Sequence, residues 1–317
     1  MAAIKPISLN KSTVFILGAG ASSPYGLPLG VNLKREMLGH LSNSACQQIL
    51  TKLEFPKSLV DDFFESLSGT YHPTIDIFLE KKKKFRSLGS YLIAYTLLPL
   101  EKHNALFPQS DWYGHLYNVI NFEDESPHAD KIKFVSLNYD RSLEHFLTKN
   151  IHYNCPDYAI ENANAKLGHI QIIHAHGSLG PYPQIPYGNK STDIYGPGVA
   201  DAYGNKSTDA SVLRTAANRI LIVSDNIQDS DDFKNAQLAI SEASNLVIIG
   251  FGYDLTTLKI LIPPATNLGT KRILGTAFNL DQSLITQVTE FFNDKIEIAP
   301  ATWDANRFLR YILPVKS

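Results

Sequence analysis

The sequence predicts an α/β fold: a doubly wound, mostly parallel Rossmann-like sheet with a helical insertion. Three observations carry this prediction. Short apolar runs alternate with segments of helical periodicity, the first run ends directly in glycines, and polar residues follow several later runs. Strands that alternate with helices are typical of a parallel sheet covered by helices on both faces.

Strands are predicted where short apolar runs have the length and composition of buried parallel strands. These runs lie at residues 13–17, 134–137, 170–175, 219–223, 245–249 and 271–275. Residues from about 42 to 125 instead have apolar positions at helical spacing, so we predict a helical insertion there. We expect a single domain over residues 1–317.

A flexible loop is predicted from about residue 178 to residue 212. The segment YGNKSTD occurs at 187–193 and again at 203–209, and the stretch between the copies is rich in Gly, Pro and Tyr. The repeat is too short for a solenoid, and residues of this kind favour turns and loops.

Composition and charge exclude several classes of protein. Asp and Glu total 31 against 29 Lys and Arg, so the net charge of −2 provides no basic field for nucleic acid. Two cysteines, Cys46 and Cys155, cannot supply a four-thiolate zinc module or a disulfide scaffold. The chain has neither a signal-peptide core nor an apolar run that spans a bilayer. We therefore expect a cytoplasmic protein with no direct nucleic-acid or membrane partner.

A glycine-rich turn, GAGAS, follows the first predicted strand. Gly18 and Gly20 permit a sharp turn and a close backbone approach to a phosphate, and Ser22 adds a hydroxyl donor. The alternative is a tight turn without a ligand. The segment lacks the third glycine of the G-x-G-x-x-G fingerprint, and no acidic strand end follows about 20 residues later, which disfavours a dehydrogenase.

Asn138, Tyr139 and Asp140 follow the second predicted strand. Ligands of doubly wound sheets bind at the carboxyl ends of strands, so these residues fit a binding site. They equally fit a helix cap, because Asp140 or Asn138 stands just before the next predicted helix. The segment 250–254, GFGYD, likewise fits two interpretations: a ligand-binding turn, or a tight connection from a strand to a helix.

His176 ends the third predicted strand beside Gly177 and is a candidate general base near neutral pH. We interpret His174 as a buried, hydrogen-bonded histidine. No carboxylate or thiolate stands at matching spacing to His169, His174 and His176, so we expect no metal site.

These segments, in this order, resemble the sirtuin superfamily, and more closely its bacterial sirtuin-like NAD hydrolase branch of antiphage defence. The resemblance covers about residues 13–260, with the helical insertion similar only in character. The matching segments are GAGAS with YGLP at 25–28, SLNYD with LE at 143–144, HAHGS at 174–178, and IIGFG at 248–252.

The resemblance implies a sirtuin-like NAD-binding domain that hydrolyses the nicotinamide–ribose bond, with NAD as substrate. Asn138 would place the attacking water, and His176 would contact the ribose hydroxyls and act as the base. Asp140 would support the site or bind ribose. The remaining NAD contacts would come from Gly18, Ala19, Gly20 and Ser22 at the pyrophosphate, from Gly250, Phe251, Gly252 and Tyr253 at the adenosine, and from Pro28.

The sequence departs from protein-deacylating sirtuins, which carry a four-cysteine zinc module. This disfavours the deacylase alternative and favours plain hydrolysis to nicotinamide and ADP-ribose. A non-catalytic NAD or ADP-ribose sensor that signals by assembly is the other alternative. The resemblance further implies NAD depletion in antiviral, abortive-infection defence, a homo-oligomer, and a HerA-type hexameric ATPase or another defence-system protein as partner.

Overall fold

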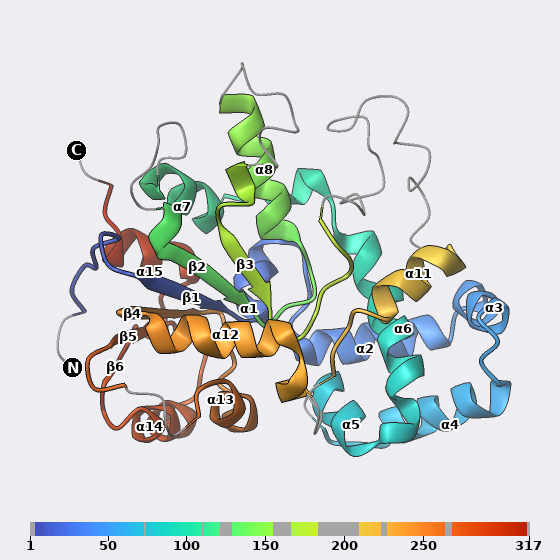
Figure 1. Ribbon diagram of the computed structural model, residues 1–317. Helices are drawn as coiled ribbons and strands as arrows, with labels where there is room; N and C mark the ends of the chain where they lie inside the picture. Colours follow the sequence, from blue (N-terminus) through green and yellow to red (C-terminus); the bar gives the residue numbers. More distant parts are fainter. Residues whose placement is uncertain are drawn as a thin grey trace.

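The computed structural model describes residues 4–72, 74–109, 111–120, 129–154, 166–182, 209–222, 227–263 and 268–315. Over these residues the chain forms an all-parallel, six-stranded sheet with helices on both faces (Figure 1). The strand order is β3-β2-β1-β4-β5-β6, which is the order of dinucleotide-binding Rossmann folds. The predicted fold class is therefore confirmed. The strands are β1 (Thr13–Leu17), β2 (Ile132–Ser136), β3 (Gln171–His174), β4 (Asn245–Ile249), β5 (Arg272–Gly275) and β6 (Ile296–Ile298).

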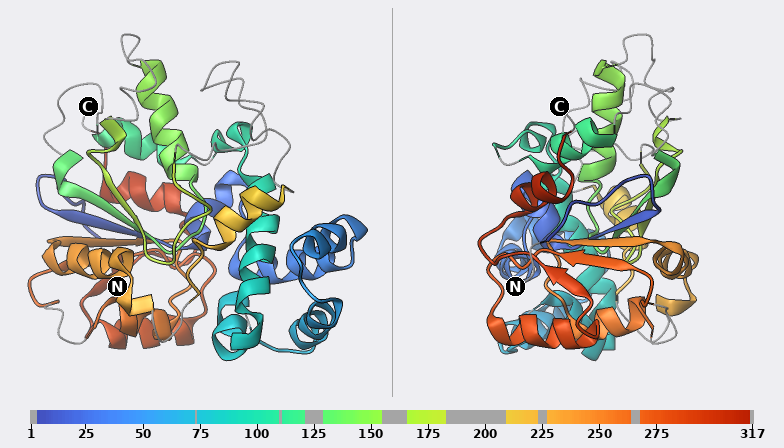
Figure 2. Two further views of the ribbon diagram at one scale, coloured as in Figure 1. Left: turned by 45° about the vertical axis from the view of Figure 1, so that its right-hand side comes forward. Right: turned by 90° about the vertical axis from the view of Figure 1, so that its left-hand side faces the viewer.

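The central strands are apolar on both faces because helices cover the sheet from both sides. Phe15 and Leu17 of β1 pack in one core with α7 (Trp112–Ile120), α8 (Ser142–Asn154) and α15 (Ala305–Ile312). Val14 and Ile16 pack in a second core on the opposite face. The helices of that face are α12 (Asp231–Glu242), α13 (Leu255–Leu261) and α14 (Gln282–Phe291), and Figure 2 shows the two layers from the side. Alternation of side chains along a strand explains this division.

The helical insertion lies beside the sheet and has a core of its own (Figure 1). Its helices contribute buried residues such as Met37, Phe63, Phe78 and Leu92 to this core. They are α2 (Gly30–Leu41), α3 (Ser44–Lys52), α4 (Lys57–Ser68), α5 (Ile75–Lys81) and α6 (Arg86–Leu97), and α11 (Ala210–Ala217) packs against α6. The predicted bounds of about 42–125 differ from these, because α2 belongs to this core and α7 packs against the sheet. The insertion is thus a compact layer that can present side chains to the adjacent sheet.

One predicted strand is wrong. Residues 219–222 form no ladder, and Ile220 makes only an isolated antiparallel bridge with Gly177. The run is apolar because Ile220 and Ile222 are buried in the core of the helical insertion. Strand β6 was not predicted, since its three residues alternate around Glu297 and give little apolar signal.

The predicted loop at about 178–212 lies largely outside the described residues, which omit 183–208. Its end was placed too late, because α11 already begins at Ala210, where Asp209 caps the helix by accepting from the Ser211 N–H. Across the part of the chain that is described, no helix is both long and apolar enough to cross a membrane.

Candidate functional site

The candidate site lies along the carboxyl edge, the side of the sheet on which all the parallel strands end. Strand β1 is paired with β2 on one side and with β4 on the other, so the chain reverses its winding direction between β1 and β4. Ligands of doubly wound sheets bind outside the strands at such a switch point. The glycine turn after β1 and the GFGYD turn after β4 lie there, with the ends of β2 and β3 alongside.

The two glycine turns touch each other through their backbones. The Gly18 N–H donates to the Ile249 carbonyl at 2.9 Å, and the Gly20 N–H donates to the Gly250 carbonyl at 2.7 Å. A Cβ on Gly18 would lie 2.5 Å from the Phe251 Cα, and one on Gly250 would lie 2.0 Å from the Ala21 nitrogen. Packing alone therefore requires these glycines, and the Gly20 N–H is already engaged within the protein.

The other residues predicted to contact the nucleotide differ in what they present. Ala19 is half-buried at the start of the short helix α1 (Ala19–Ser22), and Pro28 is half-buried just before α2. A Cβ on Gly252 would meet no atom within 4 Å. The Tyr253 side chain is buried in the sheet core and donates its hydroxyl to the Thr276 carbonyl at 2.9 Å, so only its backbone lies near the turn.

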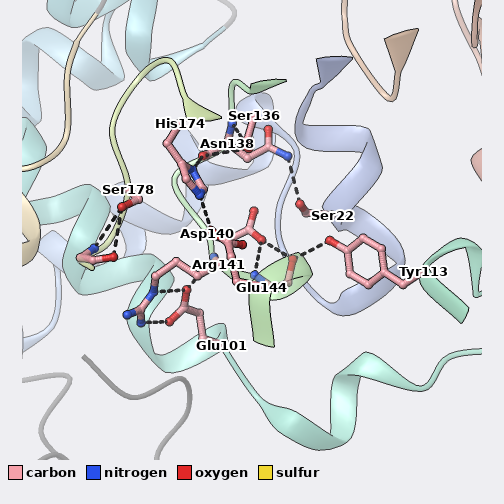
Figure 3. A network of polar contacts seen from close by, with 12 residues as sticks. Ser22, Glu101, Tyr113, Ser136, Asn138, Asp140, Arg141, Glu144, His174 and Ser178 are labelled. Carbon is pink, nitrogen blue, oxygen red and sulfur yellow. Dashed lines mark hydrogen bonds and ion pairs between the residues drawn. The ribbon is translucent and has the colours of Figure 1, made fainter. Parts of the chain in front are cut away.

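Asn138 ties the end of β2 to the glycine turn. Its Nδ2 donates to the Gly18 carbonyl at 2.9 Å and to the Ser22 hydroxyl at 3.0 Å, and Figure 3 shows the bond to Ser22. A carbonyl oxygen can only accept, so the nitrogen must face Gly18 and the orientation of the amide is fixed. Both N–H bonds are used, which leaves Oδ1 as the atom that can accept a hydrogen bond from a bound molecule.

Asp140 stabilises the start of α8, as the helix-cap interpretation predicts. Its carboxylate accepts from the Ser142 N–H at 3.1 Å and also from the Ser142 hydroxyl. Burial raises the pKa of Asp140, while hydrogen bonds from Ser142 and Ser22 oppose this rise. Tyr113 exchanges a hydrogen bond with Ser142 at 2.7 Å, so Asp140 belongs to a buried polar network that reaches α7.

His174 has a partner at each ring nitrogen. Its Nδ1 lies 2.9 Å from the Asn138 carbonyl oxygen, and its Nε2 lies 2.6 Å from Glu144 Oε1 (Figure 3). The Asn138 carbonyl can only accept, so Nδ1 carries a proton. Burial alone would lower the pKa of His174, but the Glu144 carboxylate and the two hydrogen bonds raise it to about 9. The predicted hydrogen bonding of His174 is confirmed, while its side chain is only partly buried, with 12% exposed.

His176 differs from His174 in both contacts and charge. The side chain is buried, with 7% of the residue exposed, and its Nε2 has no hydrogen-bond partner among the described residues. Burial lowers the pKa of His176, against the charges of Asp76 and Asp254 and the carbonyl of Leu137. A neutral imidazole with an unused nitrogen can exchange a hydrogen bond or a proton with a ligand.

The turn after His176 is held by the backbone. Gly177 has a φ of 73°, and a Cβ there would lie 1.7 Å from the Arg219 carbonyl oxygen. The Leu221 N–H donates to the His176 carbonyl at 2.8 Å, and the Leu179 N–H donates to the Tyr139 carbonyl at 2.8 Å. The first contacts hold the turn after β3 against residues 219–221, and the Leu179 bond holds it against the end of β2.

Three acidic residues near the site were not predicted to take part in it. Asp76 on α5 accepts from the Tyr139 hydroxyl at 2.6 Å, and its charge acts on His176. Asp254 caps α13 and also acts on His176, while Glu144 pairs with His174. Glu144 could have been found from the sequence, because it lies four residues after Asp140 and so about one helical turn further along α8. The sequence contains no such signal for Asp76, because its contact with Tyr139 depends only on the packing of the insertion.

No group of three or more His, Cys, Asp or Glu side chains that could hold a metal ion is found within the described ranges. No protein-family model matches the sequence, and no curated protein matches it.

Proposed function

We propose that this chain is an NAD⁺ glycohydrolase, which binds NAD⁺ at the carboxyl edge of the sheet and hydrolyses the nicotinamide–ribose bond. One combination carries the proposal: a fixed amide and an unpartnered imidazole at the ends of neighbouring strands. Asn138 after β2 presents Oδ1, and His176 after β3 has a buried Nε2 without a partner in the described structure. Such a pair can orient a hydroxyl or water and accept its proton.

The charges at this edge suit the proposed reaction. When the C1′–nitrogen bond breaks, its electron pair passes to the pyridinium nitrogen, and positive charge develops on the ribose carbon. The charge of Asp76, which acts on His176, favours positive charge of this kind. Asn138 Oδ1 would accept a hydrogen bond from the attacking water, whose oxygen bonds to C1′. Neutral His176 would take the proton, which gives ADP-ribose and nicotinamide.

On the resemblance, the pyrophosphate would lie against the turn at Gly18, Ala19, Gly20 and Ser22. The Gly20 N–H donates to the Gly250 carbonyl and the Ser22 hydroxyl accepts from Asn138, so neither group is wholly free for phosphate. The proposal therefore gives the glycine turn two functions, one of which is to hold the turns after β1 and β4 together.

The proposal is tested by incubating the protein with NAD⁺ and separating the products by chromatography. Asn138→Ala and His176→Ala are expected to lower kcat by about 10²–10⁴-fold, the range typical of a positioned catalytic group. Matched controls are Asn10→Ala and His169→Ala, because both residues are exposed and precede β1 and β3 at the opposite edge of the sheet. Full turnover in both site variants contradicts the proposal, and NAD⁺ binding by a wild type that never turns over favours the sensor alternative.

A further inference from the structure

The Glu144–His174 pair joins α8 to β3 and ends on the backbone of Asn138. The two side chains are 11% and 12% exposed, so the pair is nearly buried. The Asn138 carbonyl that accepts from His174 Nδ1 also accepts from the Ser136 hydroxyl at 3.2 Å. The backbone carbonyl of Asn138 is thus held by residues of β2 and β3, and its side-chain amide is held by the glycine turn.

We propose that the Glu144–His174 pair is a positioning unit for Asn138, in which Glu144 orients the His174 ring so that Nδ1–H holds the Asn138 carbonyl in place. This inference rests on the proposed function, because it assigns the pair to the hydrolysis carried out by Asn138 and His176. The pair itself touches no reacting atom. It sets the peptide plane from which the Asn138 side chain extends, and hence where Oδ1 meets the water.

Two isosteric substitutions separate positioning from simple ion pairing. In His174→Asn the new amide nitrogen takes the place of Nδ1, so the donor to the Asn138 carbonyl is kept and the contact with Glu144 is lost. In His174→Gln the amide nitrogen takes the place of Nε2, so the contact with Glu144 is kept and the donor to Asn138 is lost. If the pair served only to stabilise the fold, His174→Gln would be the milder change.

The experiment measures kcat and KM for NAD⁺ together with thermal stability. His174→Gln is expected to lower kcat by about 10²-fold, since a displacement of about 1 Å costs about 10²-fold in rate. His174→Asn is expected to lower kcat by a smaller factor, because it keeps the donor to the Asn138 carbonyl and loses only the orientation by Glu144. KM is expected to change by less than about threefold in both, because binding precedes the positioned step. His169→Asn and His169→Gln, at an exposed histidine before the same strand, are the matched controls.

Equal kcat values for the two His174 variants, or the reverse order, overturn the inference. The ¹⁵N resonances of the wild-type histidines give a second measurement that needs no variant to fold: both ring nitrogens of His174 should be protonated at neutral pH. A neutral His174 ring overturns the inference and leaves the proposed function unaffected. A wild type that cleaves no NAD⁺ overturns the proposed function, and the positioning role with it.

Discussion

The Asp76 carboxylate accepts a hydrogen bond from the Tyr139 hydroxyl at 2.6 Å, and this contact joins α5 of the helical insertion to the turn after β2. Tyr139 stands between the two polar residues of that turn, Asn138 and Asp140. Its carbonyl also accepts from the Leu179 N–H beyond His176. The helical insertion is therefore connected to the candidate site by a side chain of the strand-end motif itself.

Replacement of Tyr139 by Phe should weaken the attachment of the insertion. The buried ring is kept, while Asp76 loses a donor in a partly buried position, and hydrogen bonds to charged groups contribute about 1.5–3 kcal/mol. We expect the free energy of unfolding to fall by about that amount in urea denaturation. Tyr71→Phe is the control, because Tyr71 is fully exposed. An unchanged midpoint in Tyr139→Phe would show that the contact adds nothing to stability.

The glycines of the two turns should matter even without a nucleotide. In Gly250→Ala the new Cβ meets the Ala21 nitrogen and the backbone takes a φ of 61°, so we expect the protein to lose at least about 1–3 kcal/mol of stability without NAD⁺. Gly252→Ala in the same turn has open space and should leave the melting temperature nearly unchanged. If both variants melt like wild type, the backbone contact between the turns is unimportant.

The Glu144–His174 pair should make stability depend on pH on the alkaline side. Burial lowers the pKa of His174, but Glu144, the hydrogen bond to the Asn138 carbonyl and, more weakly, Asp140 together raise it from 6.5 to about 9. A raised pKa stabilises the folded state fully below pH 6.5, and this contribution is lost as the pH rises through about 9. It corresponds to about 3 kcal/mol of unfolding free energy. The free energies of unfolding of wild type and His174→Gln, measured in urea across this pH range, should therefore become similar at high pH. A difference between them that stays constant with pH contradicts the stabilising role of the Glu144–His174 pair.

The sequence was most informative where local composition reflects burial in the sheet. Strands β1 and β4 were predicted because every residue of both is buried, which gives continuous apolar runs. The same apolar signal wrongly predicted a strand at 219–222, where Ile220 and Ile222 are buried against helices. An apolar run reports burial, and only the pairing of neighbouring strands decides whether it is a strand.

The candidate site was predictable in so far as it follows strand ends. Asn138 and His176 were identified because polar residues directly after apolar strands gather at one edge of a parallel sheet. Asp76 could not be identified, since it lies on a helix about sixty residues earlier and reaches Tyr139 only through packing of the insertion. The engagement of the Gly20 N–H by Gly250 likewise depends on two turns that are distant in sequence.

Asp76 should tune the base of the proposed reaction. Burial lowers the pKa of His176, and the charge of Asp76 partly counteracts this because it favours the protonated ring. In the proposed reaction the neutral ring is the active form, so wild-type kcat/KM for NAD⁺ should fall only below pH 6.5. Asp76→Asn removes the charge and should move this acid limb to a still lower pH.

Asp61→Asn, on an exposed position of α4 in the same insertion, is the matched control and should leave the acid limb in place. The profile is best measured together with Tyr139→Phe, which keeps the Asp76 charge but removes its hydrogen bond. If the acid limb of the kcat/KM profile shifts in Asp76→Asn and changes little in Tyr139→Phe, the effect of Asp76 on His176 comes from its charge. A limb that moves to higher pH in Asp76→Asn contradicts this role, because loss of a nearby negative charge can only make the imidazole easier to deprotonate.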